Sequence, residues 1–309
     1  MSEAGSFDAG WLALRGPADA AARSARLTRR LADALVDGGA RPARLLDLGA
    51  GTGANLRYLA PRLAAAGVAQ QAWRLVDYDP DLLAACHGAC RAWADRNGWV
   101  ILNDTEGDDP DGFRVVGDGW QAAVRCERRD LSRAVDTLAV RPGEAVVLTA
   151  LLDLVSRNWL AGLVRLVDRA GGPLLATLTD DGLLGFAPRE PFDRVVARLF
   201  EAHQTRDKGF GPALGTGATA VLAALLAQAD RAVAVRRSAW ALGTDSRTLQ
   251  AETIRGIAAA AAEQDPSRAG EIDAWLTRRL SEAAAGGLRL LVGHRDLFAQ
   301  PKPSGGPTP

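Results

Sequence analysis

The stretch that decides the fold is Leu45–Tyr58, LLDLGAGTGANLRY. It begins with an apolar run that only Asp47 interrupts, continues through three glycines at alternate positions, and passes into the helix-forming segment Ala54–Ala66. A strand that turns through glycines into a helix brings backbone N–H groups and a helix N-terminus close to a ligand. The stretch therefore predicts the first strand, loop and helix of an α/β sheet, with a binding site at the loop.

The rest of the chain repeats this strand–helix alternation. We expect further strands over Trp73–Asp77, Trp120–Arg128, Glu144–Leu148 and Pro173–Leu178, and later over Ala232–Arg237 and Leu288–Val292. Helices are expected over about 80–96, 158–170, 191–205, 218–229, 246–262 and 267–285. Alternation at this spacing specifies a doubly wound, mostly parallel sheet with helices on both faces.

No linker-like change of composition divides the chain, so we expect one domain over residues 41–299. A helical extension, residues 1–40, precedes it, with residues 1–10 disordered and one helix from Asp19, its cap, to Val36. Two short strands around an acidic turn, Asp104–Gly112, form a hairpin-like excursion within 98–120, and helical substrate or lid insertions occupy 190–285. The Pro/Gly-rich tail, 300–309, is expected to be disordered.

Composition limits the kind of protein. The 309 residues are 48% hydrophobic and carry 37 basic against 37 acidic side chains, so no charge excess points to nucleic acid or an anionic membrane. Three cysteines are too few for a disulfide framework. The first ten residues do not read as a signal peptide, and no uncharged apolar run reaches the ~18 residues of a membrane span. We therefore expect a cytoplasmic protein that binds neither membrane nor nucleic acid.

Two cofactor classes use a strand–glycine loop–helix of this kind, dinucleotides and S-adenosyl-L-methionine. Gly49, Gly51 and Ala54 satisfy the dinucleotide fingerprint G-x-G-x-x-G/A. Asp47, however, lies two residues before the first glycine. A carboxylate there suits a cationic group such as an α-ammonium and would repel a pyrophosphate.

Two more acids follow the next core strands. Asp77 ends the second strand, where a carboxylate can accept both ribose hydroxyls, and Asp130-Leu131 follows the third, where a carboxylate and an N–H can meet an adenine edge. Three acids at successive strand ends favour the methyl donor over a dinucleotide.

These residues carry a resemblance. Leu45–Gly53 (LLDLGAGTG), Leu75–Pro80 (LVDYDP), Arg128–Leu131 (RRDL) and Val146–Ser156 (VVLTALLDLVS) resemble the successive motifs of class I S-adenosylmethionine-dependent methyltransferases, over about residues 40–180. The resemblance implies a Rossmann-like sheet of seven strands whose last, at Leu288–Val292, is antiparallel.

The same resemblance implies roles for individual residues. Gly49, Gly51 and Gly53 would wrap the methionine part of the cofactor, and Asp47 would orient it. Asp77 would hold the ribose, Tyr78 would cover the adenine, and Asp130 and Leu131 would recognise its edge. Thr149 would lie near the sulfonium. The predicted cofactor site also includes Ala50 and Asn55 of the same loop and helix, and Arg23, which either reaches the cofactor's carboxylate or is a solvated charge.

Methyl transfer from a sulfonium needs alignment, exclusion of water and sometimes a proton acceptor, but no metal. Asp153, directly after the fourth strand, and His203, after the fifth, are the candidate catalytic residues because ligands bind at the carboxyl ends of such strands. The loop Gly209–Gly217 has the glycines of a mobile lid. Cys86 and Cys90 lack the partners of a zinc site, and we expect them to pack in the core.

The sequence therefore predicts S-adenosylmethionine-dependent methyl transfer to an unidentified small molecule. Two alternatives remain open: an NAD(P)-dependent oxidoreductase, and a protein that binds S-adenosylmethionine without transferring a methyl group. The sequence leaves the acceptor atom and the oligomeric state undetermined.

Overall fold

The computed structural model describes residues 8–103 and 112–302, and a ten-stranded sheet lies at its centre. Neighbouring parallel strands are β5 (Trp120–Arg128), β2 (Gln70–Asp77), β1 (Ala43–Leu48), β6 (Glu144–Thr149) and β7 (Gly171–Ala187). Next to β7 lies β10 (Arg289–Pro301), which is antiparallel both to β7 and to the edge strand β8 (Arg231–Arg237). The mostly parallel sheet with an antiparallel last strand is confirmed.

Three further strands extend the expected set of seven. β3 (Val100–Asn103) and β4 (Phe113–Gly117) form an antiparallel hairpin that continues the sheet from β5, which confirms the hairpin-like excursion. The acidic turn between them lies outside the described residues except for Gly112. β9 (Trp240–Leu242), which the sequence did not indicate, pairs with β10.

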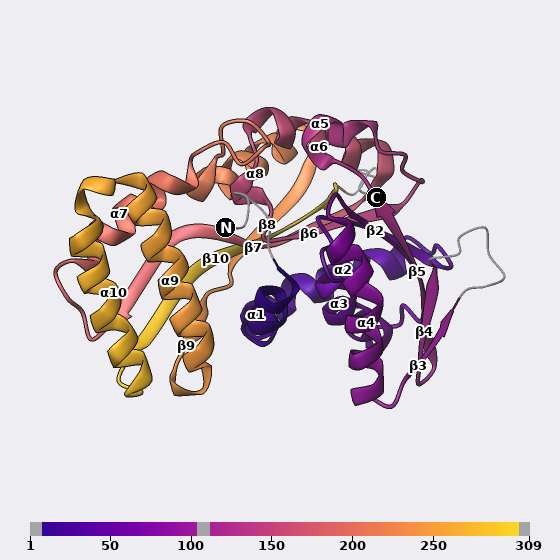
Figure 1. Ribbon diagram of the computed structural model, residues 1–309. Coiled ribbons are helices and arrows are strands. Elements are labelled where there is room, and N and C mark those ends of the chain that lie inside the picture. The colour runs from indigo at the N-terminus through magenta and orange to yellow at the C-terminus, as the bar shows by residue number, and fades with distance from the viewer. Residues whose placement is uncertain (1–7, 104–111, 303–309) are drawn as a thin grey trace.

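Helices cover both faces of the sheet (Figure 1). On one face lie α2 (Ala25–Asp37), α3 (Ala54–Ala65) and α4 (Pro80–Arg96), and on the other α5 (Leu131–Ala134), α6 (Arg157–Ala170) and α8 (Ala218–Gln228). The strands between them are buried on both faces: β6 has the burial of a continuous core strand from Glu144 to Leu148. This is the doubly wound arrangement expected of strands joined by crossover helices.

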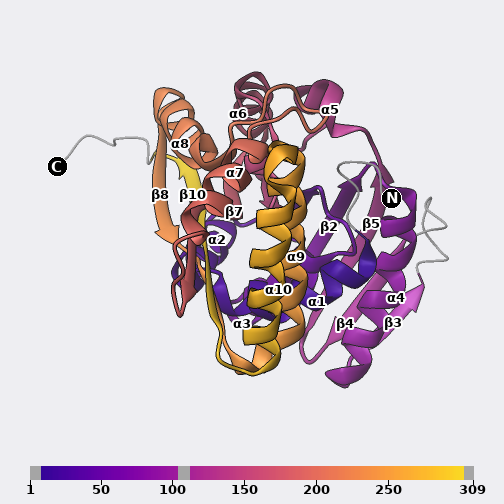
Figure 2. The ribbon, with the colours of Figure 1, turned by 60° about the vertical axis from the view of Figure 1, so that its left-hand side comes forward.

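A third group of helices lies beside the C-terminal part of β7 and the N-terminal part of β10 (Figures 1 and 2). It consists of α7 (Asp193–Gln204), α9 (Arg247–Gln264) and α10 (Ala269–Ala284). These helices share an apolar core with the strands, in which the Phe186 and Trp275 rings meet edge to face at 5.5 Å.

β7 and β10 are much longer than predicted, and the ends expected at Leu178 and Val292 are wrong. The apolar run of β7 stops at Asp180-Asp181-Gly182, which reads as a turn in the sequence. Antiparallel pairing with β10 carries the strand through these residues to Ala187. Gln300 and Pro301 likewise belong to β10, not to a disordered tail, because β8 pairs with them. Residues 303–309 lie outside the described part.

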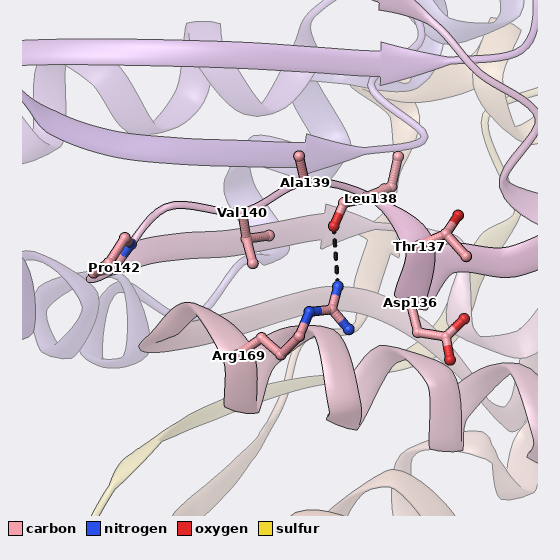
Figure 3. A pocket seen from close by; sticks show the side chains of 7 residues that line it. All are labelled: Asp136, Thr137, Leu138, Ala139, Val140, Pro142 and Arg169. Atoms are coloured by element: carbon pink, nitrogen blue, oxygen red, sulfur yellow. Dashed lines mark hydrogen bonds between the residues drawn. The ribbon is translucent and has the colours of Figure 1, made fainter.

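The connection from β5 to β6 forms a surface hollow (Figure 3). It passes through η1 (Val135–Thr137), and Asp136, Leu138, Val140 and Pro142 line the hollow together with Arg169 of α6. Arg169 donates to the Leu138 carbonyl at 3.0 Å. The hollow lies beside the first residues of β6, whereas the glycine loop follows the last residues of the parallel strand β1. The hollow and the glycine loop therefore lie at opposite ends of the parallel strands.

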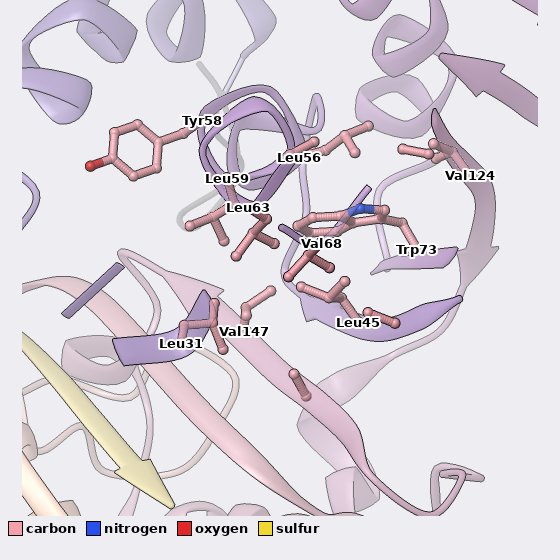
Figure 4. Packing of buried hydrophobic residues seen from close by; sticks show 14 of the residues in the cluster. Leu31, Leu45, Leu56, Tyr58, Leu59, Leu63, Val68, Trp73, Val124 and Val147 are labelled. Carbon is pink, nitrogen blue, oxygen red and sulfur yellow. The ribbon is translucent and has the colours of Figure 1, made fainter. Parts of the chain in front are cut away.

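The core beneath the glycine loop fixes α3 against the sheet (Figure 4). Leu56, Leu59 and Leu63, which share one helical face, are fully buried against the apolar side of β1 and β6. Trp73 of β2 is also buried, and its Nε1–H donates to Gln71 Oε1 at 2.9 Å. Each fully buried leucine is worth about 1.5–3 kcal/mol. The start of α3, and with it the loop, is thereby held in place.

The N-terminal segment forms two helices, so the single helix expected from Asp19 to Val36 is wrong. α1 (Ala9–Ala22) ends at Arg23, and Ser24 caps α2 by accepting from the Leu27 N–H at 3.3 Å. Asp19 caps no helix; it lies inside α1 and pairs with Arg15 at 2.8 Å. The expected disorder of residues 8–10 is also wrong, since α1 begins at Ala9, and residues 1–7 lie outside the described part.

Asp296 of β10 holds the break between α1 and α2 against the sheet. Its two oxygens accept from the Ser24 N–H at 2.7 Å and from the Leu178 N–H at 2.9 Å, and the residue is 1% exposed. Leu178 has a φ of +57°, in the left-handed region that leucine rarely adopts. One buried carboxyl group thus joins the N-terminal helices to the point where β7 leaves the parallel sheet.

We expect Asp296→Ala to destabilise the protein by about 2–4 kcal/mol, because it removes the acceptor of two backbone N–H groups at about 1–3 kcal/mol each. Urea unfolding at neutral pH measures this. Asp273→Ala, on an exposed turn of α10, is the control and should change the free energy of unfolding by less than about 0.5 kcal/mol. A loss for Asp296→Ala as small as that of the control would contradict this role.

Candidate functional site

The glycine loop adopts a left-handed backbone conformation that favours glycine. Gly49, Gly51 and Gly53 have φ values of +68°, +51° and +77°. The N–H groups of Gly49 and Ala50 donate to the Val76 carbonyl at 2.9 and 3.1 Å, which ties the loop to the end of β2. A Cβ on Gly53 would lie 2.8 Å from the Cys86 Sγ, so the loop packs directly on the buried cysteines of α4.

Asp77 lies at the end of β2, as predicted, and is buried against the loop. Its oxygens accept from the Gly51 N–H at 2.7 Å and from the Asp79 N–H at 3.1 Å. Burial raises the pKa of Asp77, and these N–H donors oppose that rise. A carboxylate has about four acceptor sites, so Asp77 can still accept from hydroxyl groups of a ligand. Tyr78, directly after it, is 52% exposed.

Asp130 and Leu131 lie where β5 ends and α5 begins. Asp130 is half-exposed and caps α5 by accepting from the Ser132 N–H at 2.9 Å. Its hydrogen bonds with Ser132 keep the Asp130 pKa below its ordinary value. Leu131 is buried, and its carbonyl accepts from the Trp159 Nε1–H at 2.7 Å.

Hydrogen bonds join four of the predicted site residues into one buried network, namely Arg23, Asn55, Thr149 and Asp47. From the break between α1 and α2, Arg23 donates to Asn55 Oδ1 at 2.8 Å and to Thr149 Oγ1 at 3.0 Å. Asn55 in turn donates to Asp47 Oδ1 at 2.7 Å. Burial lowers the Arg23 pKa, and Asp19 is the first of several groups that oppose this. The reading of Arg23 as a solvated charge is therefore wrong, since the residue is 6% exposed.

Thr177 and Tyr58 belong to the same network, and the sequence reading did not include them. The Thr177 and Thr149 hydroxyls are hydrogen-bonded at 3.0 Å across β7 and β6. The Arg23 guanidinium lies 4.6 Å from the centre of the Tyr58 ring. Thr149 and Thr177 are register partners on adjacent strands, and each follows an apolar run in the sequence, which was the available signal for Thr177.

Two buried polar atoms of this network have no partner in the structure. They are Asp47 Oδ2 and Arg23 Nε. Burial raises the pKa of Asp47 from 3.8 to about 7. Buried polar atoms are nearly always hydrogen-bonded, so an unpaired carboxylate oxygen next to a glycine loop indicates a place for a donor group of a ligand.

α1 and the segment after β6 enclose the glycine loop. Built Cβ atoms on Gly51 and Gly49 would lie 3.1 Å from Leu12 and 3.3 Å from Leu151, respectively. α1 is held in this position by Asp19, which accepts from the Trp240 Nε1–H at 2.9 Å. The N-terminal helix therefore covers the loop while fixed to β9.

Asp153, one of the two candidate bases, lies in η2 (Leu152–Leu154) directly after the end of β6. It is 9% exposed, and its Oδ1 has no partner. Burial raises its pKa, while N–H groups including that of Asp180 oppose the rise. Asp180, on β7, has a pKa raised to about 6, first by burial and then by Asp153. The structure thus places two carboxylates together where the sequence indicated one.

His203, the other candidate base, lies near the end of α7, on the side that faces α9. Its Nε2 is 3.3 Å from Glu263 Oε2, and its Nδ1 is 3.4 Å from Lys208 Nζ. Burial and the neighbouring Lys208 lower the His203 pKa. Arg206 also pairs with Glu263, at 2.6 Å. This polar cluster joins the start of the predicted lid loop to α9, whereas Asp153 lies beside the glycine loop.

His294 of β10 lies near the Asp153 side of the site and was not among the predicted residues. Its ring is 5.1 Å from that of Trp240, and its Nδ1 has no partner. Burial, followed by Arg15, lowers its pKa to about 4. His294 is therefore uncharged at neutral pH. An isolated histidine in the last strand gives no sequence signal of this position.

The raised pKa of Asp47 leads to a pH-dependent prediction. The folded protein keeps a proton on Asp47 that the unfolded chain has released above about pH 4, so its contribution to stability falls as pH rises from about 4 to about 7. Asp47→Asn removes this titration and still accepts from Asn55. We expect the stability of Asp47→Asn relative to wild type to increase between pH 5 and pH 8 by a few kcal/mol, at about 1.4 kcal/mol per pKa unit.

Urea unfolding of both proteins across that pH range tests the titration of Asp47. Asp81→Asn, an exposed position in α4, is the control and should follow the wild-type profile. Parallel wild-type and Asp47→Asn profiles would show that Asp47 is ionised throughout.

No protein-family model and no curated protein matches the chain, but solved structures are similar to it. A cyclopropane-fatty-acyl-phospholipid synthase-like protein from Lactobacillus casei is 14% identical over 92% of this chain and 98% of its own, with a TM-score of 0.48. The cyclopropane synthase MmaA2 from Mycobacterium tuberculosis is 13% identical over 95% of each chain, with a TM-score of 0.45.

A third similar structure is an S-adenosylmethionine-dependent methyltransferase from Thiobacillus denitrificans, in complex with S-adenosyl-L-homocysteine. It is 14% identical over 96% of this chain and 99% of its own, with a TM-score of 0.42. The strand order β5-β2-β1-β6-β7-β10-β8, with β10 antiparallel to both neighbours, is that of a doubly wound, mostly parallel sheet. The chain has a Rossmann-like α/β fold.

Proposed function

We propose that this protein binds S-adenosyl-L-methionine and transfers its methyl group to a small-molecule acceptor. The observation that carries the proposal is the fully buried Asp47, whose unpaired Oδ2 lies beside a loop of left-handed glycines. The donor carries an α-ammonium group, which suits this oxygen, and a dinucleotide pyrophosphate would be repelled by it.

The residues at the next two strand ends fit the remainder of the same cofactor. Asp77 has acceptor capacity left for ribose hydroxyls, and the half-exposed Asp130 can accept from an adenine amino group. Tyr78, which is 52% exposed, would cover the adenine ring. Arg23, whose buried Nε is unpaired among the described residues, would meet the carboxylate of the methionine part.

When bound, the donor supplies a methyl group on a positively charged sulfonium. The chain's part is to align the acceptor, keep out water and accept a proton. α1, held by Trp240, can exclude water from the glycine loop. We assign proton acceptance to Asp153 in preference to His203, because Asp153 lies beside the loop and its raised pKa brings it closer to neutrality. Arg23 and Thr177 together hold Thr149 beside the same space.

We further propose that the acceptor is a small, soluble molecule and that the protein acts in the cytoplasm. Within residues 8–103 and 112–302, no helix has the length and apolarity needed to cross a membrane. The acidic and basic residues of the whole chain balance, which gives no support to a nucleic-acid acceptor.

Cofactor preference tests the proposal directly. S-adenosylmethionine or S-adenosylhomocysteine at about 100 times its dissociation constant should stabilise the protein by about 2.7 kcal/mol, which a thermal-shift assay detects. NAD(H) and NADP(H) should give no shift. Stabilisation by a nicotinamide dinucleotide alone would instead identify an oxidoreductase. Methyl-labelled donor incubated with a metabolite pool then separates an enzyme, which yields labelled product, from a protein that only binds the donor.

Asp77→Asn tests the ribose assignment. The amide oxygen can still accept from the Gly51 N–H, but the negative charge and one acceptor are lost, so we expect about tenfold weaker binding of S-adenosylhomocysteine by calorimetry. Asp81→Asn, at the second residue of α4 and exposed, should bind as the wild type does. The unfolding curve of Asp77→Asn checks that the variant is folded. Unchanged affinity in a folded Asp77→Asn would refute the assignment.

A further inference from the structure

The region around Asp153 has an excess of negative charge. Five carboxylates and two arginines act on one another here, namely Asp19, Asp153, Asp180, Asp181, Glu201, Arg15 and Arg295. Asp19 pairs with Arg15 at 2.8 Å, and Asp181 lies 3.4 Å from Arg295. Among the described residues no salt bridge is formed by Asp153, Asp180 or Glu201, although Arg15 acts electrostatically on Asp153.

These carboxylates come from three elements that meet at the carboxyl edge of the sheet. Asp153 lies in η2 after β6, Asp180 on β7, and Glu201 on α7. Asp180 Oδ1 accepts from the Gly182 N–H at 2.9 Å, and Glu201 is exposed. Asp153, by contrast, is buried with an oxygen that has no partner, and Asp180 and Arg15 are the charged groups that act on it. The unpaired oxygen therefore lies in a region with an excess of negative charge.

The arrangement is unlike a metal site. Among the described residues, no three or more His, Cys, Asp or Glu side chains are grouped as metal ligands. A single buried carboxylate with a second one nearby suits instead an ammonium group, which donates up to three hydrogen bonds and compensates the charge. Leu151, two residues before Asp153, lies against the glycine loop at Gly49, so Asp153 is close along the chain to the proposed cofactor site.

We propose that the methyl acceptor is an amine, bound as its ammonium cation between Asp153 and Asp180. This inference rests on the proposed methyltransferase function and adds the chemical class of the acceptor. A buried, unpaired carboxylate favours a cationic ligand over an alcohol, which leaves the charge uncompensated, and over a carboxylate, which is repelled.

The chemistry balances with these residues. The bound ammonium first gives one proton to the Asp153 carboxylate. The nitrogen lone pair then forms the new N–C bond while the methyl–sulfur bond breaks and its electron pair stays on sulfur. The products are a methylammonium cation, a neutral thioether and a protonated Asp153, which returns its proton to solvent. A raised pKa makes Asp153 a better acceptor of that proton than an ordinary carboxylate.

Calorimetric titration of the full chain saturated with S-adenosylhomocysteine tests the proposal. The probes are n-hexylamine and benzylamine, with n-hexanol, benzyl alcohol, n-hexanoate and benzoate as neutral and anionic counterparts. We expect both amines to bind at least tenfold more tightly than their counterparts. Asp153→Asn and Asp180→Asn should each weaken amine binding about tenfold and leave S-adenosylhomocysteine affinity within about twofold. Asp273→Asn on α10 is the matched control and should leave both affinities unchanged.

The pH dependence of the wild type gives a measurement that needs no variant. Amine binding should weaken as pH falls through about 6, where Asp180 becomes protonated. The other charged groups that face Asp180 are Asp153, Asp181 and Glu201, and Arg15 faces Asp153.

Each other result has a definite meaning. Alcohols or carboxylates that bind as tightly as the amines, or amine binding that is independent of pH between 5 and 8, would overturn the amine assignment while the donor site stands. Loss of S-adenosylhomocysteine binding in Asp153→Asn would place that carboxylate in the donor site and overturn it as well. Failure of wild-type protein to bind S-adenosylhomocysteine would refute the proposed function, and the amine assignment with it.

Discussion

The candidate site depends on the hydrogen bonds that the buried guanidinium of Arg23 donates. The guanidinium links the end of α1 to Asn55 at the start of α3 and to Thr149 at the end of β6. A buried charge is costly unless it is well paired, so Arg23 fixes the relative positions of these elements. Asp296 supports it from the other side by holding Ser24, the next residue, against β7 and β10.

The hydrogen bonding of this buried network is incomplete. Asp47 Oδ2 and Arg23 Nε are buried without partners, although the core beneath them is fully packed and the polar groups of Trp73 and Gln71 are paired. Unpaired buried polar atoms cost about 1–3 kcal/mol each. Two of these atoms lie beside the glycine loop, and Asp153 Oδ1 is a third unpaired atom. Ligands that supplied the missing donors and acceptors would remove this cost on binding.

Much of the fold was predictable because its signals are local. The start of α4 at Pro80 follows from a capping Asp79 and a proline at the first helical position, and Ser156 likewise marks the start of α6. The lengths of β7 and β10 were not predictable, since Asp180-Asp181-Gly182 has the composition of a turn. The break between α1 and α2 at Arg23-Ser24 was also not predictable. It is stabilised by the tertiary contact with Asp296, which no local sequence pattern indicates.

By itself the sequence determined the glycine loop, the acids within β1, at the end of β2 and after β5, and the succession of strands and helices along the chain, since these depend on residue type and spacing. Tertiary structure alone decided that Arg23 is buried against Asn55 and Thr149, and that Asp153 faces Asp180. It also decided that His203 pairs with Glu263 of α9. Those pairs join residues 27 to 126 positions apart, and only packing of the sheet against its helices brings such side chains within hydrogen-bond or Coulombic range.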